Sequence, residues 1–344
     1  PPLPTMPAAP VILAIESSCD ETAAAICDGH GNILASVIST QIAEHQPYGG
    51  VVPELASHNH MTRLQPVVAA TLAEANLDLS AIDGFAATSG PGLASSLLVG
   101  STAAKAMALA CNRPFLAINH LEGHLLSPFI GLPDGIQPGI ALIVSGGHTL
   151  LLLLNKDGSS RLLGTTRDDA AGEAFDKAGK MLGLPYPGGP AIEKTARSGN
   201  PKAFAFPRSM LDSGDYAFSF SGLKTSLLYL LPQLGDSIRD RLPDLCASFQ
   251  EAIVDVLVSK SLRAAREFNA PSISLSGGVS CNRRLRDAFT DRARRARRNF
   301  IHATGTHTTD NAAMIAFAAL QRFRRGESSP LDADIDPNLK LASA

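Results

Sequence analysis

The chain has 344 residues and carries 30 basic against 32 acidic side chains, a formal net charge of −2. This length suits about two domains, and a composition of 45% apolar and 18% charged residues excludes a disordered chain. The near-neutral charge excludes a uniformly basic surface for nucleic acid, although a local basic patch stays compatible with it. Five cysteines, none in a CxxC pair, leave at least one unpaired, which indicates a reducing compartment.

The first ten residues lack the basic start of a secretory signal. The apolar run at 150–154 is far shorter than the roughly 20 residues that a membrane span needs. We therefore expect a short flexible extension over residues 1–10, a cytoplasmic location and no membrane partner.

Four apolar segments end in glycine or small polar residues, and helix-like stretches lie between them. The strand-like segments cover 11–22, 84–92, 140–149 and 272–280, and the helix-like ones cover 93–110, 244–268, 283–298 and 311–325. This alternation predicts an α/β fold. The Asp-Gly-His-Gly turn at 28–31 predicts a hairpin after the first strand and hence a mixed sheet.

A stretch rich in proline and glycine, Gly131 to Gly139, is the expected boundary between two halves. We expect subdomains at 11–130 and 140–310, a helix at 311–325 that packs back on the first half, and a tail at 326–344. A cleft between the halves is the expected ligand site.

Glycines after buried strands allow backbone N–H groups to approach an anion, so the Ser-Gly-Gly loops at 145–147 and 276–278 predict a phosphate cradle. The chain contains neither GxxxxGK[ST] nor GxGxxG spacing after these strands, which argues against a P-loop NTPase and a dinucleotide-binding Rossmann domain. A different nucleotide-binding fold is required.

His120 and His124 stand four residues apart, on one face of a helix and close enough to share a metal. Glu122 lies about 200° round the helix from His120, which is the wrong phase for the general base of a zinc peptidase. The third ligand should be distant in sequence. Asp310, just before the helix-like stretch 311–325, offers a carboxylate, and His307 is the competing candidate for this ligand. Two histidines and a carboxylate suit iron(II), and zinc is also compatible.

Nine motifs, in order along nearly the whole chain, are similar to those of the TsaD family, the bacterial form above all. They are ESSCDETAAAI (16–26), VVPELASHNH (51–60), SGPGLASSLLVG (89–100), NHLEGHLLSP (119–128), VSGGHT (144–149), DDAAGEAFDKAGKMLGLPYPGGP (168–190), FSFSGLKT (218–225), SGGVSCNRRLR (276–286) and TDNAAMIA (309–316). The resemblance implies an actin/Hsp70/sugar-kinase (ASKHA) fold, with two RNase-H-like halves around a central cleft.

The implied activity is transfer of a threonylcarbamoyl group from threonylcarbamoyl-AMP to the exocyclic amine of the adenosine beside the anticodon, in tRNAs that read codons starting with A. AMP is released. The resemblance assigns one divalent metal to His120, His124 and Asp310. It assigns donor binding to nine residues: Ile143, Val144, Ser145, Gly146, Gly147, Asp176, Gly189, Glu193 and Asn282.

Asp20 and Glu21, at the end of the first strand, are candidate catalytic carboxylates, for proton removal or contact with a metal-bound water; capping a turn is the alternative. Cys281, beside Asn282, departs from the usual family motif, and nothing in the sequence assigns it a role. Thr308 and Ala312 likewise replace the cysteine and glycine common around the family's Thr-Asp-Asn motif.

In bacteria the resemblance implies two partners, a TsaB-like paralogue that binds the first half and a TsaE-like ATPase, whereas a mitochondrial type acts as a homodimer. Three other functions stay open from the residues alone: a metallopeptidase, a small-molecule kinase of the same superfold, and a non-catalytic scaffold. The paired histidines argue against the scaffold, since scaffold paralogues typically lack them.

The basic charge is concentrated in one segment. Residues 283–298 hold eight arginines and two aspartates, a net charge of +6 in a chain of −2. This segment follows Asn282 directly, so it is a candidate contact for tRNA phosphates as well as a solvated helix face.

Overall fold

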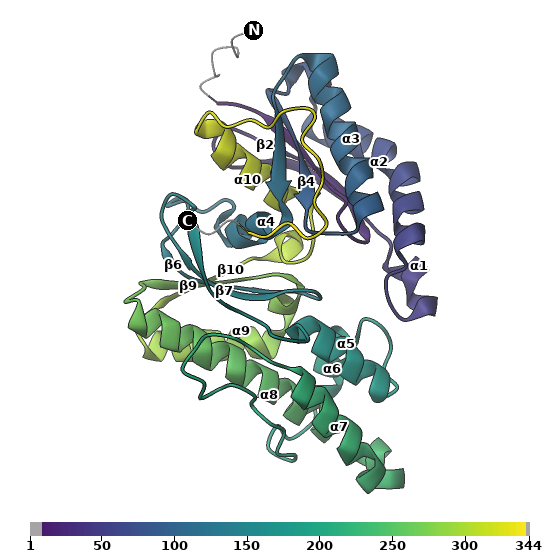
Figure 1. The fold of residues 1–344 in the computed structure, drawn as a ribbon, viewed down its shortest axis with the longest axis vertical. Coiled ribbons are helices and arrows are strands. Elements are labelled where there is room, and N and C mark those ends of the chain that lie inside the picture. Colours follow the sequence, from purple (N-terminus) through teal and green to yellow (C-terminus); the bar gives the residue numbers. More distant parts are fainter. Residues whose placement is uncertain (1–8, 342–344) are drawn as a thin grey trace. The chain divides into compact units, whose positions relative to one another are not determined.

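The computed structural model describes residues 9–341, which form two compact units (Figure 1). The first unit comprises the chain up to Ile136 together with the segment from Thr304 onward, and the second runs from Gln137 to Ala303. The division lies within the stretch 131–139, and residues 304–310 group with the first unit rather than the second. Most of the expected N-terminal extension, residues 1–8, and the end of the tail lie outside the described residues.

The first unit is built on a mixed five-stranded sheet of order β3-β2-β1-β4-β5. Its strands are β1 (Ile12–Glu16), β2 (Glu21–Cys27), β3 (Ile33–Thr40), β4 (Gly84–Gly90) and β5 (Phe115–Asn119). The first three form an antiparallel meander, and β4 and β5 join β1 in parallel. The predicted hairpin and mixed sheet are therefore confirmed; the segment 11–22 contains β1, a loop and the start of β2.

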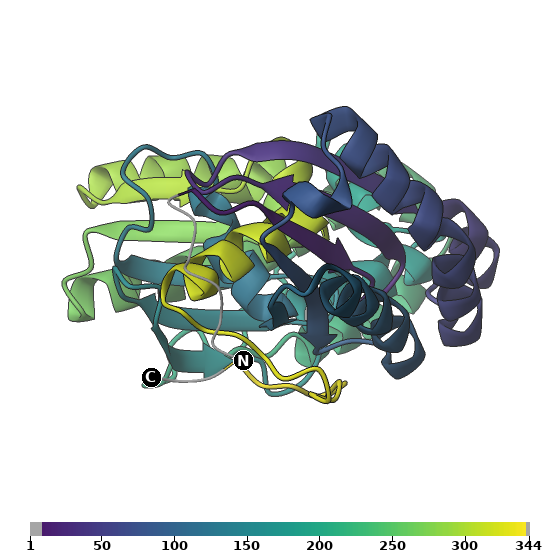
Figure 2. The same cartoon turned by 90° about the horizontal axis from the view of Figure 1, so that it is seen from above.

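Helices cover both faces of this sheet. They are α1 (Ile42–His45), α2 (Pro53–Ala75), α3 (Ala94–Cys111), α4 (His120–Leu126) and α10 (Ala312–Arg324). Leu13 and Ile15 of β1 share a buried apolar cluster with residues of α2 and α3. Because side chains alternate along a strand, Ile12 points to the other face, where Phe323 of α10 packs over Gly84. Figure 2 shows α10, in yellow, beside the strands of this sheet.

By length and composition alone, α3 is apolar enough to cross a membrane. A third of its residues are buried, and it packs against β4 and α2. A core helix of a globular domain meets the same criterion, so α3 is weak evidence for a membrane span.

The second unit repeats the topology of the first. Its sheet, of order β10-β9-β6-β7-β8, is formed by β6 (Gly139–Val144), β7 (Thr149–Leu154), β8 (Ser160–Thr165), β9 (Ser272–Ser276) and β10 (Asn299–His302). Again three strands form an antiparallel meander and two are parallel to the first. Both units thus have the strand arrangement expected of an RNase-H-like half.

The second unit also contains five longer helices. They are α5 (Ala171–Met181), α6 (Gly188–Ala196), α7 (Ser221–Leu234), α8 (Ile238–Glu267) and α9 (Arg283–Arg295). Helix α8 supplies much of the core through buried residues such as Phe249, Ile253 and Leu257. Two strands of this sheet end in glycine loops: the loop at 145–147 after β6 has two exposed glycines, whereas Gly277 after β9 is buried and Gly278 is partly exposed.

Candidate metal centre and donor-binding loops

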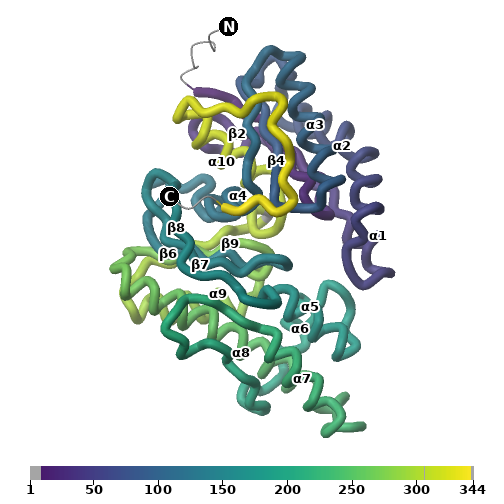
Figure 3. Tube along the Cα trace, viewed as in Figure 1, coloured from purple at the N-terminus to yellow at the C-terminus, as the bar shows by residue number. Residues whose placement is uncertain are grey.

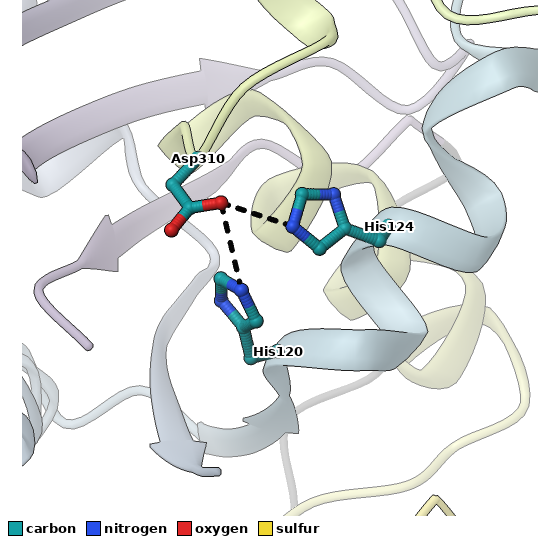
Figure 4. Close-up of side chains that lie close together, drawn as sticks. All are labelled: His120, His124 and Asp310. Atoms are coloured by element: carbon teal, nitrogen blue, oxygen red, sulfur yellow. Dashed lines mark hydrogen bonds and ion pairs between the residues drawn. The ribbon is translucent and has the colours of Figure 1, made fainter. Parts of the chain in front are cut away.

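His120, His124 and Asp310 come together in the first unit, although Asp310 is distant from the histidines in sequence. His120 opens α4 and His124 lies one turn later, and Asp310 stands just before α10, which packs against α4. The Nε2 atoms of His124 and His120 lie 3.0 Å and 3.6 Å from Asp310 Oδ1 (Figure 4). Both imidazoles are buried, whereas the Asp310 side chain is partly exposed.

This geometry fits a metal ion. Ligand atoms that bind one ion at about 2.0–2.2 Å stand roughly 3 to 3.5 Å apart, and the three ligand atoms here lie within 4.8 Å of one another. His307, the competing ligand, is not a member of this cluster in the described part of the chain. Three protein ligands would leave coordination positions open for a substrate or water.

Glu16 holds His120 in the orientation that a metal ligand needs. The Glu16 carboxylate is fully buried and lies 3.0 Å from Nδ1 of His120. It also accepts hydrogen bonds from the Thr88 hydroxyl and the Ser18 N–H, both at 2.6 Å. A carboxylate behind a ligating histidine fixes the ring and directs Nε2 toward the metal.

The charges around His120 are coupled. Burial alone would lower the pKa of His120, but the carboxylates of Asp310 and Glu16 outweigh it and raise the pKa to about 9. Burial likewise opposes ionisation of Glu16, yet the charge and hydrogen bond of His120 hold the pKa of that carboxyl below its usual value. A metal cation at this site would replace the Nε2 proton of His120.

Glu122 points away from the cluster, as its helical phase predicts. Its carboxylate is bound by the guanidinium of Arg322 on α10, with Nε 3.0 Å from Oε1. The structure therefore places Glu122 in a link between α4 and α10, and the general base required by a peptidase motif is absent from that position.

Asp20 ends the loop between β1 and β2, and Glu21 is the first residue of β2; the charge of Asp310 acts on both carboxyls. Burial raises the pKa of Asp20, and the charge of Asp310 raises it further. Burial and the charge of Asp20 raise the pKa of Glu21 to about 8. One Glu21 oxygen accepts a hydrogen bond from the Thr40 hydroxyl at 3.0 Å, and the other is buried without a partner among the described residues. A carboxyl with this pKa suits proton transfer near neutral pH.

The second unit positions the first glycine loop. Ile143 and Val144 are buried at the end of β6, and Ser145, Gly146 and Gly147 follow as the turn into β7. Gly146 and Gly147 are exposed, and a Cβ on either would contact nothing within 4 Å. The start of α5 packs so tightly on this loop that a Cβ on Gly172 would lie 2.4 Å from the Ser145 carbonyl oxygen.

Asp176 and Gly189 are brought together at the start of α6. Asp176 Oδ1 accepts a hydrogen bond from the N–H of Gly188 at 2.8 Å. Burial raises the pKa of Asp176, while the backbone N–H groups of Gly188 and Gly189 oppose that rise. The carboxylate thus holds the N-terminal turn of α6 against α5.

Glu193 and Asn282 meet at the start of α9. Glu193 Oε1 accepts a hydrogen bond from the N–H of Arg283 at 3.2 Å. Asn282 caps α9 through Oδ1, and its Nδ2 donates to Gln250 Oε1 at 2.7 Å. A pocket of about 390 Å³ opens here, lined by Glu193, Gln250 and Arg283 among others. Cys281 is exposed beside it.

Glu16 and Gln250 contact site residues but were not predicted from the sequence. Glu16 begins the first motif, but its contact with His120 depends on the parallel pairing of β1, β4 and β5. Gln250 lies on the buried face of α8, where a polar residue among apolar ones is a signal for a hydrogen-bonding role.

The comparisons with known proteins agree with the motifs. Residues 32–317 match the family described as TsaD, tRNA N6-adenosine threonylcarbamoyltransferase. A protein of that name from Anaeromyxobacter sp. (strain Fw109-5) is 51% identical over 96% of this chain and 99% of its own length. One from Syntrophobacter fumaroxidans is 47% identical over 94% of this chain and 98% of its own.

Solved structures show the fold. The structure of T. kodakarensis HypF has a TM-score of 0.62 at 14% identity, covering 92% of this chain and 48% of its own. Component A of the Acidaminococcus fermentans (R)-2-hydroxyglutaryl-CoA dehydratase has a TM-score of 0.55 at 12% identity, covering 92% and 98%. The expected ASKHA-type α/β fold is confirmed, and the relatives' names favour a transferase over a peptidase or a kinase. The chain belongs to the TsaD family of tRNA N6-adenosine threonylcarbamoyltransferases.

Proposed function

We propose that this chain transfers the threonylcarbamoyl group of threonylcarbamoyl-AMP to N6 of the adenosine next to the anticodon, in tRNAs that read codons starting with A. The observation that carries the proposal is the convergence of two histidine Nε2 atoms on Asp310 in a member of this family. The ligand set favours one iron(II) ion per chain, with zinc as the second candidate.

In the reaction, N6 of adenosine attacks the carbonyl carbon of the donor, the new C–N bond forms, and the C–O bond to the phosphate of AMP breaks. When bound, the metal supplies Lewis-acid stabilisation of the developing charge on the donor. Glu21 accepts the proton that N6 loses, for which its raised pKa of about 8 is suited. Asp20 keeps that proton affinity high through its own charge.

Replacement of Asp310 by alanine tests the metal assignment. We expect the variant to keep its circular dichroism spectrum, to lose bound iron by elemental analysis and to lose transfer activity. Exposed Asp236 offers a matched control, since Asp236→Ala should retain both metal and activity. Normal activity of the Asp310 variant without bound metal would contradict the assignment.

We assign donor binding to the Ser145–Gly147 loop with Ile143 and Val144 behind it, and to Asp176, Gly189, Glu193 and Asn282. The exposed backbone of Gly146 and Gly147 can approach the phosphate because no side chain covers it. A methyl group at Gly147 meets open space in the free protein, so Gly147→Ala should leave stability unchanged and weaken donor binding. Gly214→Ala, also in open space and exposed, is the control; equal donor affinity of both variants would contradict the assignment.

The arginines of residues 283–298, in α9 and the turn that follows it, are proposed to contact tRNA phosphates. Within the described residues, exposed Arg295 and Arg297 have no ion pair or side-chain hydrogen bond. Removing one arginine–phosphate interaction lowers the salt dependence of binding, by about 0.7–0.9 in the slope of log K against log salt. The double variant Arg295→Gln/Arg297→Gln should therefore show a shallower slope for tRNA, whereas Lys156→Gln in the β7–β8 loop should not. Identical slopes would remove the end of the 283–298 segment from the tRNA surface.

The face formed by α2 and α3 is proposed to bind a TsaB-like paralogue, with a TsaE-like ATPase as a further partner. A groove of about 760 Å³ there is lined mostly by apolar side chains, and Met61 and Leu98 are 71% and 49% exposed. An aspartate at Leu98 should abolish binding of the paralogue in sedimentation experiments without changing stability. A homodimer of the chain alone, abolished by the same substitution, would instead assign this face to a second copy.

A further inference from the structure

The C-terminal segment 328–341, here called the C-terminal strap, is ordered against the first unit. Alternate residues from Ala333 to Leu341 are partly buried, and those between them are exposed. The inward residues are Ala333, Ile335, Pro337, Leu339 and Leu341. A period of two is that of an extended chain lying on a surface; here it holds over 333–336, and a turn at 337–338 follows, closed by the hydrogen bond from the Leu339 N–H to the Asp336 carbonyl at 3.1 Å. Figure 3 shows the strap, in yellow, running alongside β4.

The strap adds to the edge of the sheet at β5. The N–H of Ser329 donates to the carbonyl of Phe115 at 2.7 Å, and the Ser329 hydroxyl oxygen accepts from the N–H of Ala117 at 3.0 Å. β5 is the outermost strand of its sheet and leads directly into α4, which carries both histidines. The strap therefore binds the strand that precedes the candidate metal ligands.

Further along, the strap crosses the ends of β4 and β5. The N–H of Asp336 donates to the carbonyl of Ser89 at 2.8 Å, and the N–H of Gly92 donates to the carbonyl of Pro337 at 3.1 Å. The contact is so close that a Cβ on Gly90 would lie 1.9 Å from the Asp336 carbonyl oxygen. In the sheet register, Gly90 pairs with Asn119, the residue before His120.

Asn119 joins the strap to α4. Its Oδ1 accepts a hydrogen bond from the N–H of Leu121 at 2.8 Å and so caps the helix. Its Nδ2 donates to the carbonyl oxygen of Lys340 in the strap at 3.1 Å. Both the oxygen and the nitrogen of the Asn119 side-chain amide are thus hydrogen-bonded. Through this contact the strap fixes the rotamer of Asn119, which caps the helix of His120 and His124.

A second route leads from the strap to the same imidazole. Gly92, which donates to the strap, lies beside Leu93, whose N–H donates to the carbonyl of Ser18 at 2.8 Å. The Ser18 hydroxyl lies 3.2 Å from Nδ1 of His120. The strap thus supports both the helix that carries His120 and the loop that contacts the back of its ring.

We propose that the C-terminal strap is a positioning element for the metal centre, holding His120 at its ligand position through Asn119 and through the β4–α3 loop. The inference rests on the proposed metal site of His120, His124 and Asp310. Contacts that orient a ligating histidine are typically worth 10–100-fold in metal affinity.

The test uses Co(II) as the probe, because its visible absorption reports ligand geometry. Three proteins are titrated with a competing chelator present: the full chain, a chain ending at Glu327, and Asn119→Asp, which keeps the helix cap but loses the donor to Lys340. We expect Co(II) to bind at least 10-fold more weakly to both variants, with an altered absorption band. A synthetic peptide of residues 328–341 should restore the band of the truncated chain.

Two glycine substitutions in the full-length chain, one a test and the other its control, examine the same contact. Gly90→Ala blocks the approach of Asp336, whereas Gly131, also at positive φ, has nothing within 4 Å of its added Cβ. Gly90→Ala should weaken Co(II) binding and Gly131→Ala should not. Circular dichroism and urea unfolding of the metal-free proteins separate an altered ligand geometry from a failure to fold.

The outcomes distinguish the strap from the site itself. If the full chain binds Co(II) and the truncated, Asn119 and Gly90 variants, all folded, bind it equally well, the strap has no positioning role and the inference is overturned. If the full chain binds no Co(II), the metal site proposed above fails, and the strap inference is overturned with it.

Discussion

Replacing Glu16 by glutamine removes the charge behind His120 while keeping the size of the side chain. In the native protein, Glu16 accepts three hydrogen bonds, from the N–H of Ser18, the hydroxyl of Thr88 and Nδ1 of His120. A glutamine has only one oxygen. If that oxygen serves Thr88 and His120, its NH2 group faces the N–H of Ser18, and two buried donors oppose each other.

In the other orientation the NH2 group faces His120, so Nδ1 must accept and the proton moves to Nε2, the atom that should bind the metal. Either arrangement leaves a buried polar group unsatisfied or the ligand in the wrong tautomer. An unsatisfied buried donor costs about 1–3 kcal/mol of folding stability. Loss of an orienting carboxylate costs about 10–100-fold in metal affinity, equivalent to about 1.4–2.7 kcal/mol.

The assay measures zinc affinity by chelator competition and stability by urea unfolding of the metal-free protein. Glu44→Gln is the control, because Glu44 lies on the surface and pairs with Arg63, away from the cluster. We expect a loss of zinc affinity in Glu16→Gln and none in the control. A Glu16→Gln protein with native zinc affinity would show that the carboxylate does not orient His120 and would refute the reasoning.

Three further predictions concern pH, the core and the first glycine loop. The metal-free protein should lose stability in thermal melts as the pH rises from about 6.5, the usual pKa of histidine, to about 9, because the charged form of His120 is favoured only in the folded state. Metal affinity should rise over the same pH range. If neither stability nor metal affinity changed with pH, this assignment would be contradicted. Lys260→Met should destabilise the second unit by about 2–3 kcal/mol in urea, because buried Lys260 donates to the Ser213 hydroxyl and to the carbonyls of Asp215 and Ala217. An unchanged midpoint of urea unfolding would argue against a stabilising role of these hydrogen bonds. Gly172→Ala should displace the Ser145 carbonyl, 2.4 Å from the added Cβ, and weaken donor binding by calorimetry, and native affinity would show that the loop adapts.

Local patterns predicted the elements well because each depends on near neighbours. Each of these signals spans only a few residues: the buried strands that end in glycine, the turn at 28–31, and the spacing of His120 and His124. The structure confirms the strands, the hairpin and the shared face of the two histidines. Helix bounds agree less closely at the start of α8, which begins at Ile238 rather than at Asp244.

Contacts between distant segments could not be predicted from such patterns. Asp310 was one of two candidate third ligands, and only the family resemblance selected it over His307, since no local spacing links either residue to α4. Glu16 and His120 meet because β1, β4 and β5 pair in parallel, which the alternation of strands and helices does not specify. The strap was expected only as a tail, although the alternation of apolar residues from Ala333 to Leu341 was a signal for a segment packed on a surface.

Mass analysis of tRNA nucleosides tests the central claim most directly. Cells depleted of this protein should lose threonylcarbamoyladenosine from tRNAs that read codons starting with A. The wild-type chain should restore the modified nucleoside, and Asp310→Ala, expressed at the same level, should not. An unchanged level after depletion would contradict the assigned function, and full restoration by Asp310→Ala would contradict the role of the metal centre.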